Sequence, residues 1–252
     1  MQNLKDKKAV VTGGNSGIGY ATAKLLKEQG ASVVITGRDA EKVRAAAAEL
    51  GVTGIVADSA DVAALGKLTE TVKTQMGEVD ILFLNAGVFY PTPLGQIDEA
   101  AFDKQMAINF KGAVFTLEKF LPLLKDGASV INLSSVNAYT GMPNTAVYAA
   151  SKAAMNSFTR TAATELAPRK IRVNAVNPGP VATPIFGKTG LDEASINGFA
   201  AAITNRVPLK RVGQPEEVAK LVVFLASDDA SFITGAEYNI DGGINVNPLL
   251  AG

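Results

Sequence analysis

Short apolar runs alternate with helix-like segments along the 252-residue chain, and this alternation limits its possible folds more than any other feature. The apolar runs predict β-strands at Lys8–Thr12, Ala31–Thr36, Val52–Ala57, Val79–Leu84, Ser129–Leu133, Ile171–Val176 and Glu237–Ile240. Helices are predicted at Tyr20–Gln29, Glu41–Leu50, Asp61–Met76, Glu99–Leu123, Ala146–Ala167 and Pro215–Ser227. Continuous apolar strands that alternate with helices are typical of a parallel sheet with both faces covered. The sequence therefore predicts an α/β fold with one domain spanning residues 1–252.

A glycine-rich loop, GGNSGIG at residues 13–19, separates the first predicted strand from the first predicted helix. A loop in this place brings backbone N–H groups and a helix N-terminus up to a phosphate. Gly13 permits a tight turn, Gly17 a close approach to pyrophosphate, and Gly19 close packing of the helix. Glycine clusters often form plain turns, but the position between strand and helix favours a phosphate-binding loop.

The end of the second predicted strand decides which ribose a dinucleotide site accepts. A carboxylate there binds a 2′-hydroxyl, whereas an arginine accommodates a 2′-phosphate. Gly37 and Arg38 stand at this place, so NADP(H) is favoured and NAD(H) is the alternative. Arg38 can also be a solvated residue at a helix start, with Asp39 as the N-cap of that helix.

Tyr148 and Lys152 stand four residues apart in an alanine-rich segment, which places both side chains on one face of a helix. A positive charge about 6 Å from a phenol favours the phenolate by about 3 kcal/mol at an effective dielectric of 20. Lys152 could therefore supply most of the pKa shift that a tyrosine needs to transfer protons near neutral pH. The spacing alone favours the plainer alternative, in which Tyr148 packs in a core and Lys152 extends to solvent.

Composition excludes several kinds of chemistry. The chain has no cysteine and no histidine, so disulfides, thiolate nucleophiles and histidine acid/base catalysis are impossible, and no metal site is expected. The net charge of zero gives no electrostatic footprint for nucleic acid or an anionic membrane. Without a signal peptide or an apolar run of membrane-spanning length, we expect a cytoplasmic protein.

Other candidate residues lie where predicted strands end or where the pattern loosens. Asn85-Ala86-Gly87 follows the fourth strand, at the edge where open α/β sheets bind ligands. Asn109 interrupts an apolar helical stretch and needs partners if buried. Residues from about 180 to 211 form an irregular stretch, with a weak helix at Asp192–Asn205, that is typical of a lid or binding loop.

Several motifs stand together in one order: the glycine loop, Asn85-Ala-Gly87, Asn109, Ser135, Tyr148-xxx-Lys152, Asn177-Pro-Gly179 with Thr183, and Asp241-Gly-Gly243. In this order and spacing the chain resembles the short-chain dehydrogenase/reductase family over nearly its whole length. The resemblance implies a Rossmann-type, doubly wound parallel sheet of about seven strands and an oxidoreductase that interconverts a ketone or aldehyde and an alcohol by hydride transfer. It also outweighs the plainer reading of Tyr148.

The resemblance assigns roles residue by residue. Tyr148 matches the general acid/base, Lys152 the residue that lowers the tyrosine pKa and holds the nicotinamide ribose, Ser135 the hydroxyl that binds the substrate oxygen, and Asn109 the anchor of a proton-relaying water. The implied cofactor-binding residues are Gly13, Asn15, Ser16, Gly17, Ile18, Gly19, Arg38, Asp58, Ser59, Asn85, Ala86, Gly87, Tyr148, Lys152, Pro178, Gly179, Val181 and Thr183. Two positions depart from the family pattern: Leu84 replaces an asparagine, and the glycine loop has no basic residue.

The substrate is less constrained than the reaction. Phe89, Tyr90, Tyr139, Met142, Ile185, Phe186 and Phe199 suggest a small apolar carbonyl or alcohol, although they could equally pack a lid or a subunit contact. The alternatives are a 3-oxoacyl-[acyl-carrier-protein] reductase, for which Lys125, Arg169 and Lys170 offer a basic rim, and a non-catalytic nucleotide sensor. The resemblance also implies a homotetramer.

Overall fold

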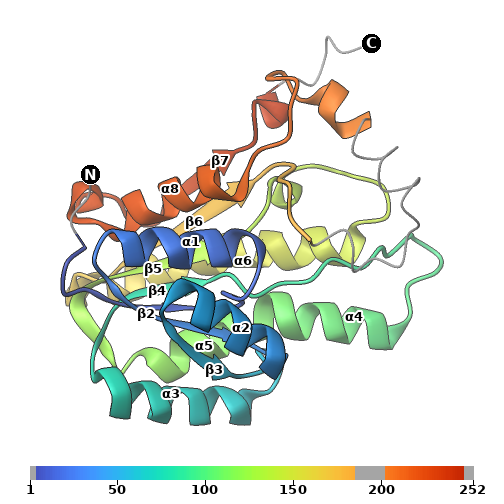
Figure 1. Ribbon diagram of the computed structural model, residues 1–252. Helices are drawn as coiled ribbons and strands as arrows, with labels where there is room; N and C mark the ends of the chain where they lie inside the picture. The colour runs from blue at the N-terminus through green and yellow to red at the C-terminus, as the bar shows by residue number, and fades with distance from the viewer. Residues whose placement is uncertain (1–3, 185–201, 247–252) are drawn as a thin grey trace.

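A parallel β-sheet organises the computed structural model, which describes residues 4–184 and 202–246 (Figure 1). Its strands are β1 (Lys8–Val11), β2 (Ser32–Gly37), β3 (Thr53–Val56), β4 (Val79–Leu84), β5 (Leu124–Leu133), β6 (Arg172–Pro178) and β7 (Glu237–Ile240). They form one seven-stranded sheet in the order β3-β2-β1-β4-β5-β6-β7, and every pairing is parallel. The order reverses between β1 and β4, which is where open α/β sheets bind ligands.

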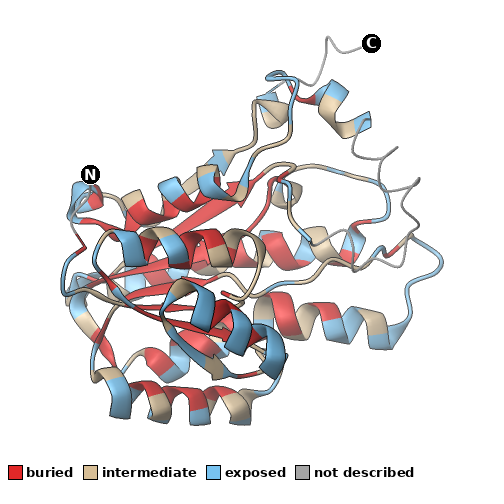
Figure 2. Ribbon diagram, in the orientation of Figure 1, coloured by how far each residue is buried: buried red, intermediate tan, exposed pale blue. Residues whose placement is uncertain are grey.

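Helices cover both faces of this sheet. They are α1 (Gly17–Glu28), α2 (Ala40–Leu50), α3 (Val62–Met76), α4 (Glu99–Met106), α5 (Gly112–Phe120), α6 (Ala146–Leu166) and α8 (Pro215–Ala226). Successive residues of a strand point to opposite faces, so Val11 packs with α1, α2 and α8 while Val10 packs with α3, α5 and α6. Figure 2 shows buried residues along the strands and on the helix faces turned toward them. The predicted doubly wound, Rossmann-type sheet is confirmed.

Two predicted elements differ from the structure by more than small shifts of their ends. The long helix expected over Glu99–Leu123 is α4 and α5 joined by a π-helical turn at Ala107–Lys111, and it ends at Phe120. Strand β5 begins at Leu124 rather than Ser129 because Leu124 is buried and pairs with Val79. The register then shifts between Val79 and Ile81, which marks a β-bulge or irregularity in this pairing. Of the weak helix expected at Asp192–Asn205, only residues 202–205 lie within the described chain, and they are helical.

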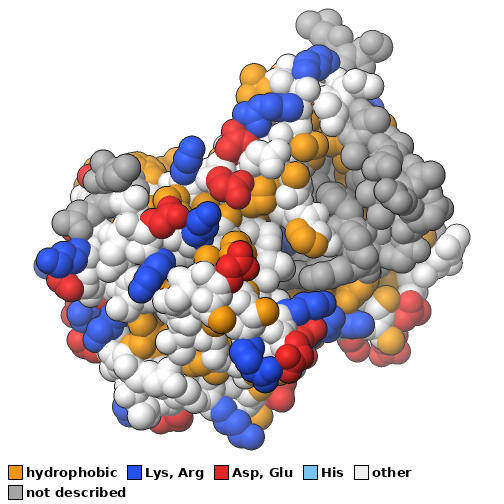
Figure 3. Space-filling model, in the orientation of Figure 1, with side chains coloured by type: hydrophobic (Ala, Val, Ile, Leu, Met, Phe, Trp, Pro, Cys, Tyr) orange, Lys and Arg blue, Asp and Glu red, His pale blue; other side chains and the backbone are white. Residues whose placement is uncertain are grey.

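The surface agrees with the neutral composition. On the face shown in Figure 3, Lys and Arg side chains are interspersed with Asp and Glu side chains. Among the described residues, no helix is both long enough and apolar enough to span a membrane.

The N-terminus of α3 depends on Asp61, whose carboxylate accepts hydrogen bonds from the backbone N–H groups of Ala63 at 2.8 Å and Ala64 at 3.2 Å. Loss of such a cap costs about 1 kcal/mol. We therefore expect Asp61→Ala to lower the free energy of unfolding by about 1 kcal/mol in urea titrations. Asp61→Asn keeps the acceptor oxygen and is the matched control. Equal losses in both variants would show that charge, not capping, is responsible.

Candidate active site

A cavity of about 600 Å³ opens at the carboxyl edge of the sheet, where the strand order reverses. Of the residues predicted to form the site, it is lined by Gly13, Asn15, Ser16, Gly17, Ile18, Arg38, Asp58, Ser59, Asn85, Ala86, Gly87, Ser135, Tyr148, Lys152, Pro178, Gly179, Val181 and Thr183. Gly19 and Asn109 are the two predicted residues that do not line it. Residues distant in the sequence thus meet at one cavity.

The glycine loop has the geometry that an anionic group requires. Gly13 and Gly17 adopt φ values of +63° and +56°, a left-handed conformation that glycine adopts without strain. Ser16, the N-cap of α1, makes no side-chain capping bond, and the first turn of α1 contains no acidic residue. Backbone N–H groups at this helix N-terminus therefore face the cavity without a side-chain acceptor, which fits the pyrophosphate of a dinucleotide.

Thr12 and Asn85 lock this loop to the end of β4. The Thr12 hydroxyl accepts hydrogen bonds from the backbone N–H groups of Asn85 at 2.9 Å and Ala86 at 3.1 Å. The Asn85 amide donates to the backbone oxygens of Thr12 at 2.9 Å and Gly13 at 3.0 Å. A Cβ on Gly19 would lie 2.5 Å from the Asn85 amide nitrogen, so Gly19 permits close packing behind the cavity. Sequence reasoning missed Thr12, although a polar residue that ends an apolar strand could have indicated it.

Arg38 and Asp58 lie at the part of the cavity next to β2 and β3. Asp39 is the N-cap of α2 and accepts a hydrogen bond from the Lys42 N–H at 3.1 Å. The exposed Arg38 guanidinium makes no ion pair with the described residues. Because Asp39 is engaged in capping, Arg38 is the side chain at the strand end that remains available to a ligand.

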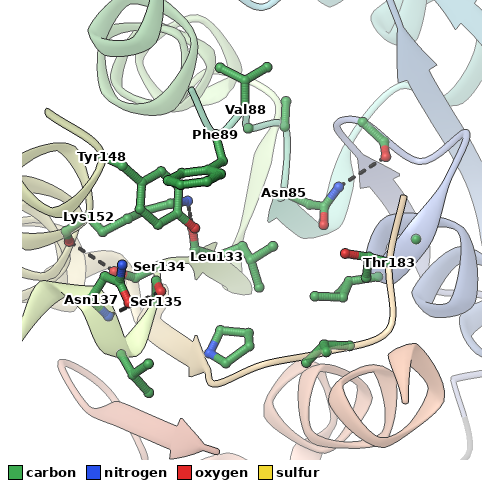
Figure 4. Close-up of a pocket in the computed structure, with 18 of the residues that line it drawn as sticks. Asn85, Val88, Phe89, Leu133, Ser134, Ser135, Asn137, Tyr148, Lys152 and Thr183 are labelled. Atoms are coloured by element: carbon green, nitrogen blue, oxygen red, sulfur yellow. Dashed lines mark hydrogen bonds between the residues drawn. The ribbon is translucent and has the colours of Figure 1, made fainter. Parts of the chain in front are cut away.

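Tyr148, Lys152 and Ser135 converge on the other side of the cavity (Figure 4). Tyr148 and Lys152 project from one face of α6, and the Lys152 ammonium lies 5.6 Å from the centroid of the Tyr148 ring. That ammonium also donates a hydrogen bond to the Leu133 backbone oxygen at 2.7 Å, at the end of β5. Ser135 follows β5 and accepts a hydrogen bond from the Asn137 N–H at 3.1 Å. Ser134 instead donates to the Lys152 backbone oxygen at 2.9 Å and ties α6 to the strand end.

Burial dominates the ionisation of this pair. It raises the pKa of Tyr148, while a hydrogen bond with Ser135 lowers that pKa by a smaller amount. Burial lowers the pKa of Lys152 to about 8. The net shift of the Tyr148 pKa is therefore upward, opposite to the lowering expected from Lys152. Removing the phenolate from water destabilises it by more than the nearby groups stabilise it.

Asn109 lies in the π-helical turn and is buried, but its side chain faces the backbone of another segment rather than the cavity. It accepts a hydrogen bond from the Val88 N–H at 2.8 Å and donates to the Val88 oxygen at 2.9 Å. It also donates to the Ser151 hydroxyl at 3.2 Å. These partners explain a buried asparagine in an apolar helix, and π-helical turns are frequent at functional sites.

The end of β6 and the segment after it line the cavity next to the glycine loop. A Cβ on Gly17 would lie 3.4 Å from the Thr183 methyl carbon, so these segments are in contact. A Cβ on Gly179 would lie 2.7 Å from the Asp241 Cα, which explains why glycine stands there. The Asp241 carboxylate accepts hydrogen bonds from the N–H groups of Gly243 at 2.9 Å and Asn245 at 3.1 Å.

The aromatic and aliphatic residues expected at the mouth separate into three groups. Phe89 and Met142 line the cavity. Tyr90 and Tyr139 do not line the cavity. Tyr90 lies under the Lys104 ammonium, and Tyr139 donates a hydrogen bond to Glu237. Ile185, Phe186 and Phe199 lie outside the described residues. Ile203, Arg206, Ile244 and Asn245 line the cavity but were not predicted, since no motif marks them.

Comparisons with known proteins agree with this geometry. The family model described as enoyl-(acyl carrier protein) reductase matches residues 13–245. The chain is 43% identical to oxidoreductase asL5 of Sarocladium schorii, covering 97% of this chain and 98% of that protein. It is 35% identical to the NADP-dependent (R)-specific alcohol dehydrogenase of Lentilactobacillus kefiri, covering 95% and 97%.

A solved structure is also similar to this chain. The short-chain dehydrogenase/reductase (glucose/ribitol dehydrogenase) of Brucella melitensis superposes with a TM-score of 0.91 at 34% identity and covers 97% of this chain and 99% of that chain. With the doubly wound sheet, the glycine loop and the convergent Ser135, Tyr148 and Lys152, these matches place the chain in the short-chain dehydrogenase/reductase family of oxidoreductases.

Proposed function

We propose that the protein interconverts a ketone or aldehyde and an alcohol with NADP(H), using Tyr148 as the general acid/base. The observation that carries this proposal is that Ser135, Tyr148 and Lys152 share one cavity with the glycine loop. The loop can hold a pyrophosphate, and the three side chains can hold and protonate an oxygen beside it. The chemistry fits a chain that has no histidine or cysteine.

The residues divide the work as follows. A bound nicotinamide dinucleotide supplies or accepts the hydride. Ser135 donates a hydrogen bond to the substrate oxygen and orients it. In reduction the Tyr148 hydroxyl gives its proton to that oxygen, and in oxidation the phenolate takes the alcohol proton. Lys152, held by the Leu133 oxygen, provides positive charge beside the phenolate and a donor for the nicotinamide ribose.

The cavity wall suggests the kind of substrate. Phe89, Met142, Ile203 and Ile244 provide apolar surface within it. Such a lining favours a small apolar carbonyl compound or alcohol, since apolar walls exclude water and leave few polar groups to satisfy. A screen of such compounds would determine the identity of the substrate and the stereochemistry of the reaction.

A carrier-protein substrate is less well supported. Lys125, at the start of β5, pairs with Asp80 at 3.6 Å, and Arg169 bonds Asp126 at 2.9 Å. Both lie toward the amino edge of the sheet, whereas the cavity opens at the carboxyl edge. Lys125 and Arg169 are therefore paired with carboxylates and lie on the edge of the sheet opposite the cavity. A non-catalytic nucleotide sensor has no need of the three converging side chains, and turnover of any carbonyl in the screen rules it out.

Replacing Tyr148 tests the mechanism directly. Tyr148→Phe keeps the ring and removes the proton donor, so we expect kcat for ketone reduction to fall by at least about 100-fold. NADPH binding, measured by fluorescence titration, should change little. Retained ketone reduction in this variant would defeat the mechanism.

Replacing Lys152 tests its electrostatic role. The Lys152 ammonium favours the Tyr148 phenolate only while it is charged, and burial lowers its pKa to about 8 in the ligand-free chain, so the proposed role requires the bound cofactor to keep it charged. Lys152→Met removes the charge at every pH, so the pKa of Tyr148 rises further and the optimum for alcohol oxidation moves to higher pH. We expect kcat to fall by about 100-fold or more. Lys125→Met is the matched control at the opposite sheet edge, and an unchanged pH profile in Lys152→Met would contradict the role.

Arg38 tests the choice of cofactor. A charge-assisted hydrogen bond contributes about 1.5–3 kcal/mol, so Arg38→Ala should raise the KM for NADPH by about 10- to 100-fold and leave the KM for NADH unchanged. Arg44→Ala, which removes an exposed arginine paired with Glu41 on α2, is the matched control. Equal effects on both cofactors would overturn the assignment.

A further inference from the structure

Two side-chain amides hold the backbone of the segment that follows β4. Asn109 binds both the N–H and the oxygen of Val88, at 2.8 Å and 2.9 Å. Gln105 accepts a hydrogen bond from the Tyr90 N–H at 2.7 Å. Val88 and Tyr90 are therefore fixed from the same side by residues four apart along α4 and the π-helical turn.

The spacing of the two amides matches the spacing of the groups they bind. Four residues advance a helix by about 6 Å, and two residues of an extended chain span about 6.6 Å. Gln105 and Asn109 thus bind the backbone of residues 88–90 as the edge of a neighbouring strand would, and in the described part of the chain no strand pairs with these residues. Both side chains are buried, with exposures of 0% and 2%.

A glutamine at position 105 is unfavourable for stability. Its side-chain nitrogen is buried and has no hydrogen-bond partner in the described part of the chain. An unpaired buried donor is destabilising, so an apolar side chain would suit the packing better. What an apolar side chain cannot supply is the acceptor for the Tyr90 N–H.

The residue between the two fixed points is Phe89. Its ring lies 5.2 Å from the Tyr148 ring, centroid to centroid, at an interplanar angle of 81°. Phe89 lines the cavity, and Figure 4 shows it against Tyr148 on the side away from Ser135. The position of this ring follows from the backbone on either side of it, because Val88 and Tyr90 are its neighbours.

We propose that Gln105 is a positioning residue for proton transfer: with Asn109 it clamps Val88 and Tyr90, and so holds Phe89 edge-on against Tyr148. The inference rests on the proposed function of Tyr148. Gln105 does not line the cavity and acts through Phe89.

The clamp has a consequence for ionisation. The charged group that faces Tyr148 is Lys152 on α6, the polar group is Ser135 after β5, and the segment after β4 contributes the apolar Phe89. Phe89 thus adds to the burial that raises the pKa of Tyr148. If the ring is released, water reaches the phenol and its pKa falls.

The first test is Gln105→Met, which keeps the volume and removes the acceptor. We expect kcat for ketone reduction to fall by about 10-fold, the KM for NADPH to stay unchanged, and the alkaline limb of the kcat profile to move to lower pH. Lys104→Met is the matched control, since it removes a side chain 5.0 Å from the Tyr90 ring and leaves the backbone clamp intact. A Gln105→Met profile identical to that of the wild type overturns the proposal.

A double-mutant cycle with Phe89→Ala separates positioning from general loss of structure. If Gln105 acts through Phe89, Phe89→Ala alone shifts the pH profile in the same direction, and adding Gln105→Met changes kcat by less than twofold further. Additive losses overturn the proposal. If Gln105→Met fails to fold, a pH profile of Phe89→Ala that equals that of the wild type overturns the proposal.

The inference and the proposed function can fail separately. Ultraviolet pH titration of the tyrosinate, taken as the difference between each protein and its Tyr148→Phe counterpart, reports the pKa of Tyr148 without turnover. A wild-type protein that turns over no carbonyl compound refutes the function. A Tyr148 pKa that is equal with and without Gln105→Met refutes the clamp.

Discussion

The site depends on the hydrogen bonds that Thr12 and Asn85 make between the ends of β1 and β4. These strands are neighbours in the sheet but lie on either side of the reversal in strand order. Parallel strands bring their carboxyl ends to one edge, and the loops that leave β1 and β4 there diverge to opposite faces. Four hydrogen bonds close this divergence and set the glycine loop against Ala86 and Gly87. The glycine loop and the end of the cavity lined by Ser135, Tyr148 and Lys152, the proposed reacting end, therefore share one edge of the sheet.

The reacting end is assembled on the same principle, from side chains that bind the backbone of another element. Lys152 binds the end of β5 through the Leu133 oxygen, Ser134 returns a bond to the Lys152 oxygen, and Asn109 binds Val88. Each bond is buried or partly buried, so its loss would leave polar groups unpaired inside the protein, and each one fixes the relative position of two elements. The groups that would contact a substrate are therefore held by residues on helices and at strand ends.

Much of this arrangement follows from local sequence. Glycines in the loop after a strand predict positive φ values, and Tyr148 and Lys152 at helical spacing predict a shared face; both depend on a few neighbouring residues. The π-helical turn and the early start of β5 were not predictable in this way, because the pairing of Leu124 with Val79 and the bonds of Asn109 to Val88 are tertiary contacts. Thr12, Gln105 and Arg206 were missed for the same reason. Their partners or surroundings are distant in the sequence, and threonine, glutamine and arginine each have many ordinary places in a protein.

Burial acts on Tyr148 and Lys152 in opposite directions and sets a condition for catalysis. It raises the pKa of the phenol and lowers that of the ammonium to about 8, so raising the pH of the isolated chain deprotonates Lys152 before Tyr148. Lys152 can then stabilise a phenolate only if something else favours charge in this part of the cavity. A ribose hydroxyl that accepts a hydrogen bond from the ammonium, and a positively charged nicotinamide ring that favours the phenolate, are groups of the required kind, and the glycine loop fits the dinucleotide that carries both. Under the proposed function, the pair becomes an acid/base only when the cofactor is bound, because burial of the two side chains opposes their ionisation.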